Sequence, residues 1–341
     1  MTQGLMGLGK TGVSKKWKKF MDDNTRSSLN CMAAFRMNRM PVERRDEKWI
    51  ADQLKRRDTR FIPVWQSKNL LSHDALPRSV MLSNRRLGGL LDKSETIILL
   101  GKEKGRVYFA IALPSDDPSM PANFATLGRF RELRDTAAWL PPKDAALLAY
   151  SRAILYWHHH KRFCGSCGSP TRSVECGHMR ICTSEQCRQE HFPRTDPAII
   201  VLVTWGEYCL LARQPSWPKA FYSTIAGFVE PGESLENAVV REVLEETGIH
   251  LRGVHYHSSQ PWPFPSSIML GFTAEAATRD IKLGRDELED AAWFTREDIR
   301  HASRTGKLKL PTRVSIASRL IEDWFRSDGS GGLEFVMSYE L

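Results

Sequence analysis

Long hydrophobic runs are missing from this sequence of 341 residues. Its hydrophobic stretches, such as Ala198–Val203, are far shorter than the roughly 20 residues that a membrane-spanning helix needs. The pattern of a secretory signal peptide, a basic head followed by an apolar run, is also missing. We therefore expect no membrane partner. The composition, with 41% hydrophobic and 26% charged residues, is typical of a globular protein of two or three domains.

Acidic residues are scarce in residues 1–45, where ten Lys/Arg stand against three Asp/Glu. This segment carries most of the net charge of +9, so charge alone does not indicate a nucleic-acid-binding body. We interpret residues 1–45 as a basic, flexible tail, with Met32, Met37 and Met40 as alternative starts of the chain. A basic segment poor in acids is also typical of a mitochondrial presequence, an alternative that stays open beside the expected cytoplasmic location.

The tail also contains the letters of a phosphate-binding loop, G-x-x-x-x-G-K-[ST], at Gly4, Gly9, Lys10 and Thr11. A working loop follows a buried strand and opens a helix, which lets backbone N–H groups converge on the phosphates. Because only three residues precede Gly4, we expect no strand there and interpret the match as accidental.

Hydrophobic periodicity and composition divide the rest of the chain into four segments. Residues 46–158 predict a small α+β domain that ends in an apolar helix. The histidine run His158–His160 is interpreted as a solvated helix end. Residues 159–193 form a cysteine-rich unit, residues 194–326 alternate strands and helices, and residues 327–341 form a C-terminal tail.

The seven cysteines do not suggest a disulfide scaffold, because their number is odd and five of them lie within 24 residues. Two pairs with the spacings C-x-x-C and C-x₄-C are separated by fourteen residues, which favours a zinc ribbon. Four thiolates without an open position predict a structural, tetrahedral Zn²⁺ site. Its expected ligands are Cys164, Cys167, Cys182 and Cys187, with Cys176 and His178 as a less regular alternative.

Three glutamates, Glu242, Glu245 and Glu246, have the spacing that places them on one face of a helix. Carboxylates this close repel each other, so we expect a divalent cation among them. Oxygen ligands alone favour hard ions such as Mg²⁺ or Mn²⁺, which bind phosphate oxygens and activate water. Arg241, beside them, can hold a carboxylate in a bidentate pair. The alternative, a solvated acidic face, would have lysines four residues after the glutamates and would not explain the flanking glycines.

The segment around these glutamates resembles the Nudix box, G-x₅-E-x₇-R-E-U-x-E-E-x-G-U, in which U is a bulky aliphatic residue. All nine fixed positions match: Gly227, Glu233, Arg241, Glu242, Val243, Glu245, Glu246, Gly248 and Ile249. The resemblance implies an α/β fold, the Nudix α/β/α sandwich with a mixed sheet, preceded by the zinc ribbon and the small α+β domain. It also implies hydrolysis of a nucleoside diphosphate linked to another group.

A second motif follows shortly after the box. Ser259–Ser267 alternates prolines with Trp262 and Phe264, a stiff aromatic rim that suits a planar base, although such a loop can also cap a core. The segment is similar to the SQPWPFPxS signature of the NADH pyrophosphatase subfamily, whose members also have a zinc ribbon and a small N-terminal domain. The C-x₄-C spacing departs from the C-x-x-C of many bacterial members.

The resemblance implies roles for individual residues. Residues implied to serve the catalytic Mg²⁺ or Mn²⁺ are Glu242, Glu245, Glu246, Glu287 and Glu233. Glu246 would orient or deprotonate the attacking water, and Arg241 belongs to the same catalytic set. Residues implied to contact the substrate, partly across the interface of a homodimer, are Phe192, Phe228, Gln260, Trp262, Phe264 and Ser267.

The implied reaction is attack of water at phosphorus, which splits NADH or NAD⁺ into (reduced) nicotinamide mononucleotide and AMP. The same chemistry would remove NAD caps from RNA 5′ ends. Two alternatives stay open: a Nudix hydrolase that prefers another dinucleotide such as ADP-ribose, and a non-catalytic, NAD-responsive regulator that binds nucleic acid. The second is disfavoured because every glutamate of the box is present.

Overall fold

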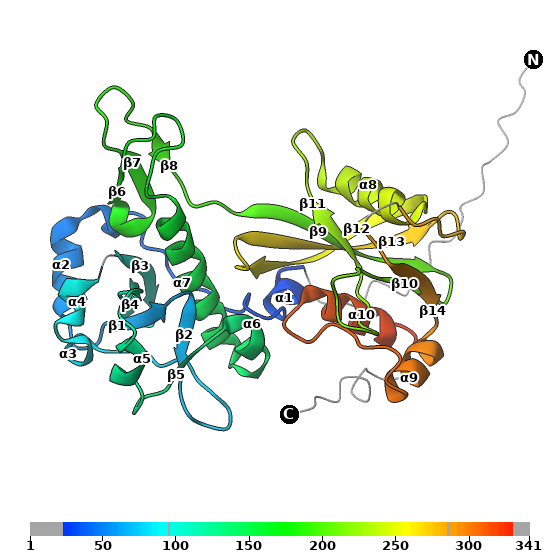
Figure 1. Cartoon of the computed structure of the whole chain (residues 1–341), viewed down its shortest axis with the longest axis horizontal. Helices are drawn as coiled ribbons and strands as arrows, with labels where there is room; N and C mark the ends of the chain where they lie inside the picture. The colour runs from blue at the N-terminus through cyan, green and yellow to red at the C-terminus, as the bar shows by residue number, and fades with distance from the viewer. Residues whose placement is uncertain (1–22, 95, 285–286, 330–341) are drawn as a thin grey trace, which may run out of the picture.

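The computed structural model describes residues 23–94, 96–284 and 287–329 (Figure 1). The phosphate-loop letters at residues 4–11 and most of the predicted C-terminal tail lie outside these residues. No helix in these ranges is long and apolar enough to cross a membrane. Three units follow one another: an N-terminal domain, a small cysteine-rich sheet, and a larger domain built on a six-stranded sheet.

The N-terminal domain is built on a five-stranded sheet with the order β3-β4-β1-β2-β5. Its strands are β1 (Arg60–Trp65), β2 (Lys68–Leu71), β3 (Thr96–Glu103), β4 (Arg106–Ala112) and β5 (Arg129–Arg131). Strands β1 and β4 run parallel, and the other neighbours run antiparallel.

Each face of this sheet has its own core, because successive side chains of a strand point to opposite faces. Ile62 and Ile98 pack on the side of the long helix α7 (Pro142–His160), which follows the short α6 (Leu133–Thr136). Phe61 and Leu99 pack on the other side. That side is covered by four short helices: α2 (Glu47–Lys55), α3 (Asn84–Leu87), α4 (Leu90–Lys93) and α5 (Met120–Asn123).

The first described residues belong to the fold. After α1 (Asp23–Ser28), Met32 is buried in the core beside α7, and Met40 is buried in the opposite core. Asn38 pairs with Lys102 of β3 through two backbone hydrogen bonds of 3.0 and 2.8 Å. The predicted flexible tail is therefore folded here. Single methionines and backbone pairs hold it, and neither leaves a periodic pattern in the sequence.

The histidine run at the end of α7 is solvated only in part. His159 and His160 are exposed as predicted, but the prediction is wrong for His158, which is buried. Its Nε2 donates to Gly177 O at 2.7 Å, and its Nδ1 accepts from Arg180 at 2.9 Å. Burial lowers the pKa of His158 to about 4, so this side chain is a neutral link between α7 and the cysteine-rich unit.

The cysteine-rich unit is a three-stranded antiparallel sheet of β6 (Thr171–Val174), β7 (Met179–Cys182) and β8 (Glu190–His191). It lies at the end of α7 (Figure 1). His178 donates to Leu99 O at 2.7 Å, and Glu175 accepts from Arg44 at 3.1 Å. These contacts attach the unit to the N-terminal domain.

The larger domain has the strand order β12-β13-β9-β10-β14, with β11 paired to β9. Its strands are β9 (Asp196–Trp205), β10 (Tyr208–Arg213), β11 (Ile225–Phe228), β12 (Leu251–Trp262), β13 (Ser267–Ala276) and β14 (Asp290–Phe294). Only β9 and β13 are parallel among the described pairs, so the sheet is mixed.

Helices cover both faces of this sheet (Figure 1). One face carries α8 (Leu235–Thr247), and the other carries α9 (Arg296–Arg304) and α10 (Ile316–Arg326). The predicted α/β/α sandwich with a mixed sheet is confirmed.

The N-terminal segment also reaches this domain. Asn30 Nδ2 donates to Ser258 Oγ at 3.0 Å and to Ser259 O at 2.9 Å, both on β12. Gln260 Nε2 donates to Cys31 O at 2.8 Å. Residues 25–31 thus pack along β12, the edge strand of the sheet.

Replacing Asn30 with alanine removes both hydrogen bonds and leaves buried acceptors without that donor. We expect the free energy of unfolding to fall by about 1–3 kcal/mol in chemical denaturation. The neighbouring Leu29→Ala is the control, because Leu29 is exposed. Equal effects of the two variants would show that the segment lies outside the cooperatively folded unit.

Candidate active site

The loop between β11 and α8 and the two ends of the helix are fixed by local interactions. Gly232 has φ +94°, a conformation that other residues rarely adopt. Ser234 caps α8 by accepting a hydrogen bond from Asn237 N at 3.2 Å, and Gly248, with φ +69°, ends the helix. Between these ends, Val243 is fully buried under the sheet, which fixes the rotation of the helix about its axis.

Three carboxylates meet beside this helix. One oxygen each from Glu242, Glu246 and Glu287 lies within 4.8 Å of the others. Glu242 is 8% exposed and Glu246 is 5% exposed, whereas Glu287 is exposed. The donor set is oxygen only and is open on the Glu287 side, as a hard divalent cation requires.

The electrostatics of the cluster are unfavourable without a cation. Burial, together with the charges of Glu242 and Glu287, raises the pKa of Glu246 to about 8. Burial also raises the pKa of Glu242. Each of these carboxylates therefore gains stability when positive charge is placed beside it.

Gly227 allows a strand to pass directly beside the cluster. A Cβ at this position would lie 2.0 Å from the carboxyl carbon of Glu242, closer than any real contact. The first fixed position of the box therefore has a steric reason: only glycine lets β11 and the Glu242 carboxylate come this close.

Arg241 holds the acidic residues that stand outside the cluster. Its guanidinium donates to both oxygens of Glu233, at 2.6 and 2.9 Å, and to Phe228 O at 2.9 Å. It also donates to Glu242 at 2.9 Å and to Glu245 at 3.1 Å. The hydrogen bonds from Arg241 lower the pKa of Glu233 to about 2. Of the five predicted metal-serving glutamates, three share the cluster and two, Glu233 and Glu245, lie on this arginine.

A glycine outside the box places Glu287. Gly284 N donates to Glu246 O at 3.0 Å, and Lys282 N donates to Thr247 O at 2.8 Å, so the loop after β13 docks on the end of α8. A Cβ on Gly284 would lie 2.4 Å from Glu245 O. Sequence reasoning missed Gly284; its only signal is that it stands three positions before Glu287.

The four predicted zinc ligands come together at one end of the cysteine-rich sheet. The Sγ atoms of Cys164, Cys167, Cys182 and Cys187 lie within 4.8 Å of one another. Hydrogen bonds from Ser166 N and from Ser169 lower the pKa of Cys164 to about 7 and that of Cys167 to about 6, which favours the thiolates that zinc needs.

The alternative zinc ligands face elsewhere. Cys176 packs against the core of the N-terminal domain, where burial raises its pKa to about 11. His178 is bonded to Leu99 O. The structure therefore favours the four-cysteine set over the alternative.

Comparison with protein families divides the chain in the same way. The NUDIX domain model matches residues 194–313. An NADH pyrophosphatase-like rudimentary NUDIX domain matches residues 58–157, and an NADH pyrophosphatase zinc ribbon domain matches residues 159–192. The NAD-capped RNA hydrolase NudC of Mycobacterium bovis is 36% identical over 310 residues, which cover 85% of this chain and 96% of that protein. This chain belongs to the Nudix hydrolase family.

Two longer relatives each match a part of this Nudix hydrolase. The NAD-capped RNA hydrolase NUDT12 of Macaca fascicularis is 41% identical over 198 residues, covering 55% of this chain and 43% of that protein. Nudix hydrolase 19, chloroplastic, of Arabidopsis thaliana is 40% identical over 237 residues, covering 65% and 54%. The chain spans about half the length of these two relatives. The predicted resemblance to the zinc-ribbon-bearing subfamily is confirmed.

The predicted substrate-contacting residues of this Nudix hydrolase divide into exposed and packed ones. Phe192 is 62% exposed and Phe228 is 61% exposed. Trp262 and Phe264 are half-buried against the N-terminal core, with their ring centroids 5.1 Å apart. Ser267 opens β13 opposite Trp262.

Gln260 has a structural position in this chain. It is 0% exposed, and its amide bonds Cys31 O at 2.8 Å, Val314 O at 2.7 Å and Ile316 N at 2.7 Å. The side chain thereby joins the N-terminal segment, β12 and the start of α10.

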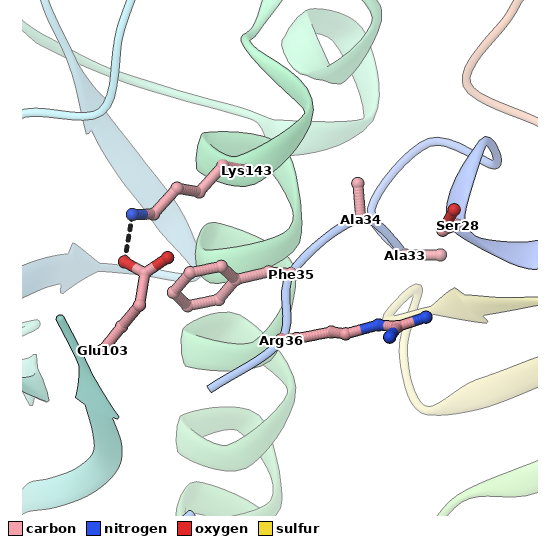
Figure 2. A pocket seen from close by; sticks show the side chains of 7 residues that line it. All are labelled: Ser28, Ala33, Ala34, Phe35, Arg36, Glu103 and Lys143. Carbon is pink, nitrogen blue, oxygen red and sulfur yellow. Dashed lines mark hydrogen bonds and ion pairs between the residues drawn. The ribbon is translucent and has the colours of Figure 1, made fainter. Parts of the chain in front are cut away.

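Two cavities lie away from the carboxylate cluster. The larger, of about 370 Å³, is bordered by residues 28–36 and by the first turn of α7. Figure 2 shows Lys143 paired with Glu103 beside the ring of Phe35, while Arg36 points to the opposite side. The smaller, of about 330 Å³, lies at Phe264.

Gly284→Ala should weaken binding of divalent cations, because the added Cβ forces the loop that carries Glu287 away from α8. We expect the Kd for Mn²⁺, measured by calorimetric titration, to rise about 10- to 100-fold. Gly89→Ala is the control, since a Cβ there would meet nothing within 4 Å. An unchanged Kd for Gly284→Ala would show that Glu287 does not contribute to cation binding.

Cys182→Ser should abolish retention of zinc, because it removes a buried ligand from the closed site. Cys176→Ser should leave the zinc content of the purified protein unchanged. Elemental analysis of both variants distinguishes the two ligand sets. Loss of zinc from Cys176→Ser alone would favour the alternative set.

Proposed function

We propose that this Nudix hydrolase splits the pyrophosphate of NADH and NAD⁺ into (reduced) nicotinamide mononucleotide and AMP, and that it removes NAD caps from RNA 5′ ends. The observation that carries the proposal is the partly buried cluster of three carboxylates, in a chain that aligns with 96% of NudC. The three family matches, two of which carry the NADH pyrophosphatase description, support the choice of substrate.

The residues of the cluster fit Mg²⁺ or Mn²⁺. Glu242, Glu246 and Glu287 offer oxygen ligands only, and burial has raised the pKa of the first two, so positive charge stabilises their ionised forms. When bound, such cations neutralise the pyrophosphate oxygens and make water a better nucleophile.

The chain's own residues supply the rest of the chemistry. Glu246 orients the attacking water and accepts its proton as the new O–P bond forms and the bridging P–O bond breaks. Arg241 holds Glu233 and the carbonyl of Phe228, which keeps the entry loop of α8 in place. The exposed ring of Phe228 lies at the end of β11, where a substrate base can stack on it.

We further propose that the active form is a homodimer. Phe192 and Phe228 each expose a large aromatic side chain, which a second copy or a substrate ring would cover. We expect sedimentation of the purified protein to give twice the mass of one chain. A monomer at micromolar concentration that still hydrolyses NADH would contradict this part of the proposal.

The activity is tested by chromatography of products from an equimolar mixture of NADH, ADP-ribose and NAD-capped RNA with Mg²⁺. We expect NADH and the cap to be consumed first, and Glu246→Gln to lower kcat by about 10²- to 10⁴-fold. Glu236→Gln is the matched control, since it removes a charge from an exposed position on the same helix.

Two other outcomes would each contradict one part of the proposed function. Faster loss of ADP-ribose would keep the hydrolase and contradict the substrate. No cleavage with either Mg²⁺ or Mn²⁺ would contradict catalysis and favour a binding protein.

A further inference from the structure

The cavity of about 330 Å³ is lined by residues of the N-terminal domain and of the tip of the β12–β13 hairpin. Its volume is within the range of small-ligand pockets. The residues that line it are Glu132, Arg134, Asp135, Arg152, Phe264 and Pro265. Four of the six are charged, so the cavity differs from an apolar packing defect.

Two guanidinium groups gather at one aromatic ring. The Cζ atoms of Arg134 and Arg152 lie 5.3 and 5.0 Å from the centroid of the Phe264 ring. Arg134 also lies 5.5 Å from the ring of Trp262. Two positive charges at the same ring favour a bound anion.

Arg152 carries a donor with nothing to bind. Its Nε is buried and has no hydrogen-bond partner among the described residues, although its Nη1 donates to Pro263 O. A buried, unsatisfied donor of a charged group is costly. Because Arg152 lines the cavity, its guanidinium charge attracts an anion bound there.

The other lining groups suit the remainder of a ribonucleotide. Arginines bind phosphate, the Phe264 ring offers a face to a base, and the carboxylates of Glu132 and Asp135 accept hydrogen bonds from ribose hydroxyls. We propose that this cavity binds a ribonucleotide of the RNA body, with its phosphate at Arg134 and Arg152. The inference rests on the proposed cap-removing function and extends it.

Strand register places the cavity at the same end of the sheet as the mouth of the active site. Phe228 pairs with Ala198, Ala198 with Met269, and Met269 with Gln260. β12 ends two residues later, at Trp262, where the hairpin turns. Three strand spacings, about 14 Å, separate β11 from β12, so an RNA chain that leaves the cap can cross this end of the sheet to the cavity.

The test compares Arg134→Gln with Arg131→Gln, an equal loss of charge at an exposed position on β5 that does not line the cavity. We expect Arg134→Gln to raise KM for a short NAD-capped RNA about tenfold, with kcat and both constants for NADH unchanged. The slope of log KM against log salt concentration should fall by about 0.7. Arg131→Gln should match the wild type.

Two results would overturn the inference. An equal rise of KM for NADH would show that Arg134 only holds the aromatic hairpin. Unchanged constants for capped RNA would show that no phosphate is bound there.

Binding without cleavage separates this inference from the proposed function. Uncapped RNA of the same sequence should bind the wild type about tenfold more tightly than Arg134→Gln, measured by fluorescence anisotropy. If only AMP, measured by calorimetry, shows the difference, the site takes free mononucleotides and the RNA assignment is wrong. If uncapped RNA binds the wild type more tightly than Arg134→Gln while the wild type cleaves neither NADH nor capped RNA, the RNA site is supported and the proposed function is contradicted.

Discussion

Mutual repulsion among three closely placed carboxylates is the constraint around which the catalytic domain is arranged. Oxygens of Glu242, Glu246 and Glu287 lie within 4.8 Å, which is unfavourable for a folded protein without compensating charge. The neighbouring backbone is shaped to permit it. Gly227 leaves room for one carboxylate, and Gly284 docks the loop that delivers another.

Arg241 offsets part of the negative charge of the glutamates in and around this cluster. It binds Glu233, Glu242 and Glu245 at once, and it also fixes the carbonyl of Phe228. Glu233 and Glu245 are thereby paired by the protein itself, and Glu242 is bound by this arginine while it also belongs to the carboxylate cluster. Arg241 thus links the two glutamates outside the cluster to Glu242 within it.

The sequence was informative wherever chemistry demands a fixed spacing. The glutamates at i and i+4 and the two cysteine pairs predicted side chains that gather, because ligands of one ion must converge. The spacing was wrong for Glu245, which lies on Arg241, and Glu287 was implied only by the family resemblance. Contacts between segments that are distant in the chain produce no such regular spacing in the sequence. Asn30 and Gln260 are ordinary polar residues in the sequence, and only the fold shows that their amides join the N-terminal segment to β12. Gly284 was missed for the same reason.

The contacts of the N-terminal segment limit the order in which the protein can fold during its synthesis. Residues 25–31 are translated long before their partner strand, because Asn30 bonds Ser258, a residue 228 positions further along the chain. Until that partner is translated, the segment has no strand to lie on, although Met32 beside it already belongs to the N-terminal core. The edge strand of the catalytic sheet is therefore covered by a segment made well before it, which has no partner strand until β12 is translated.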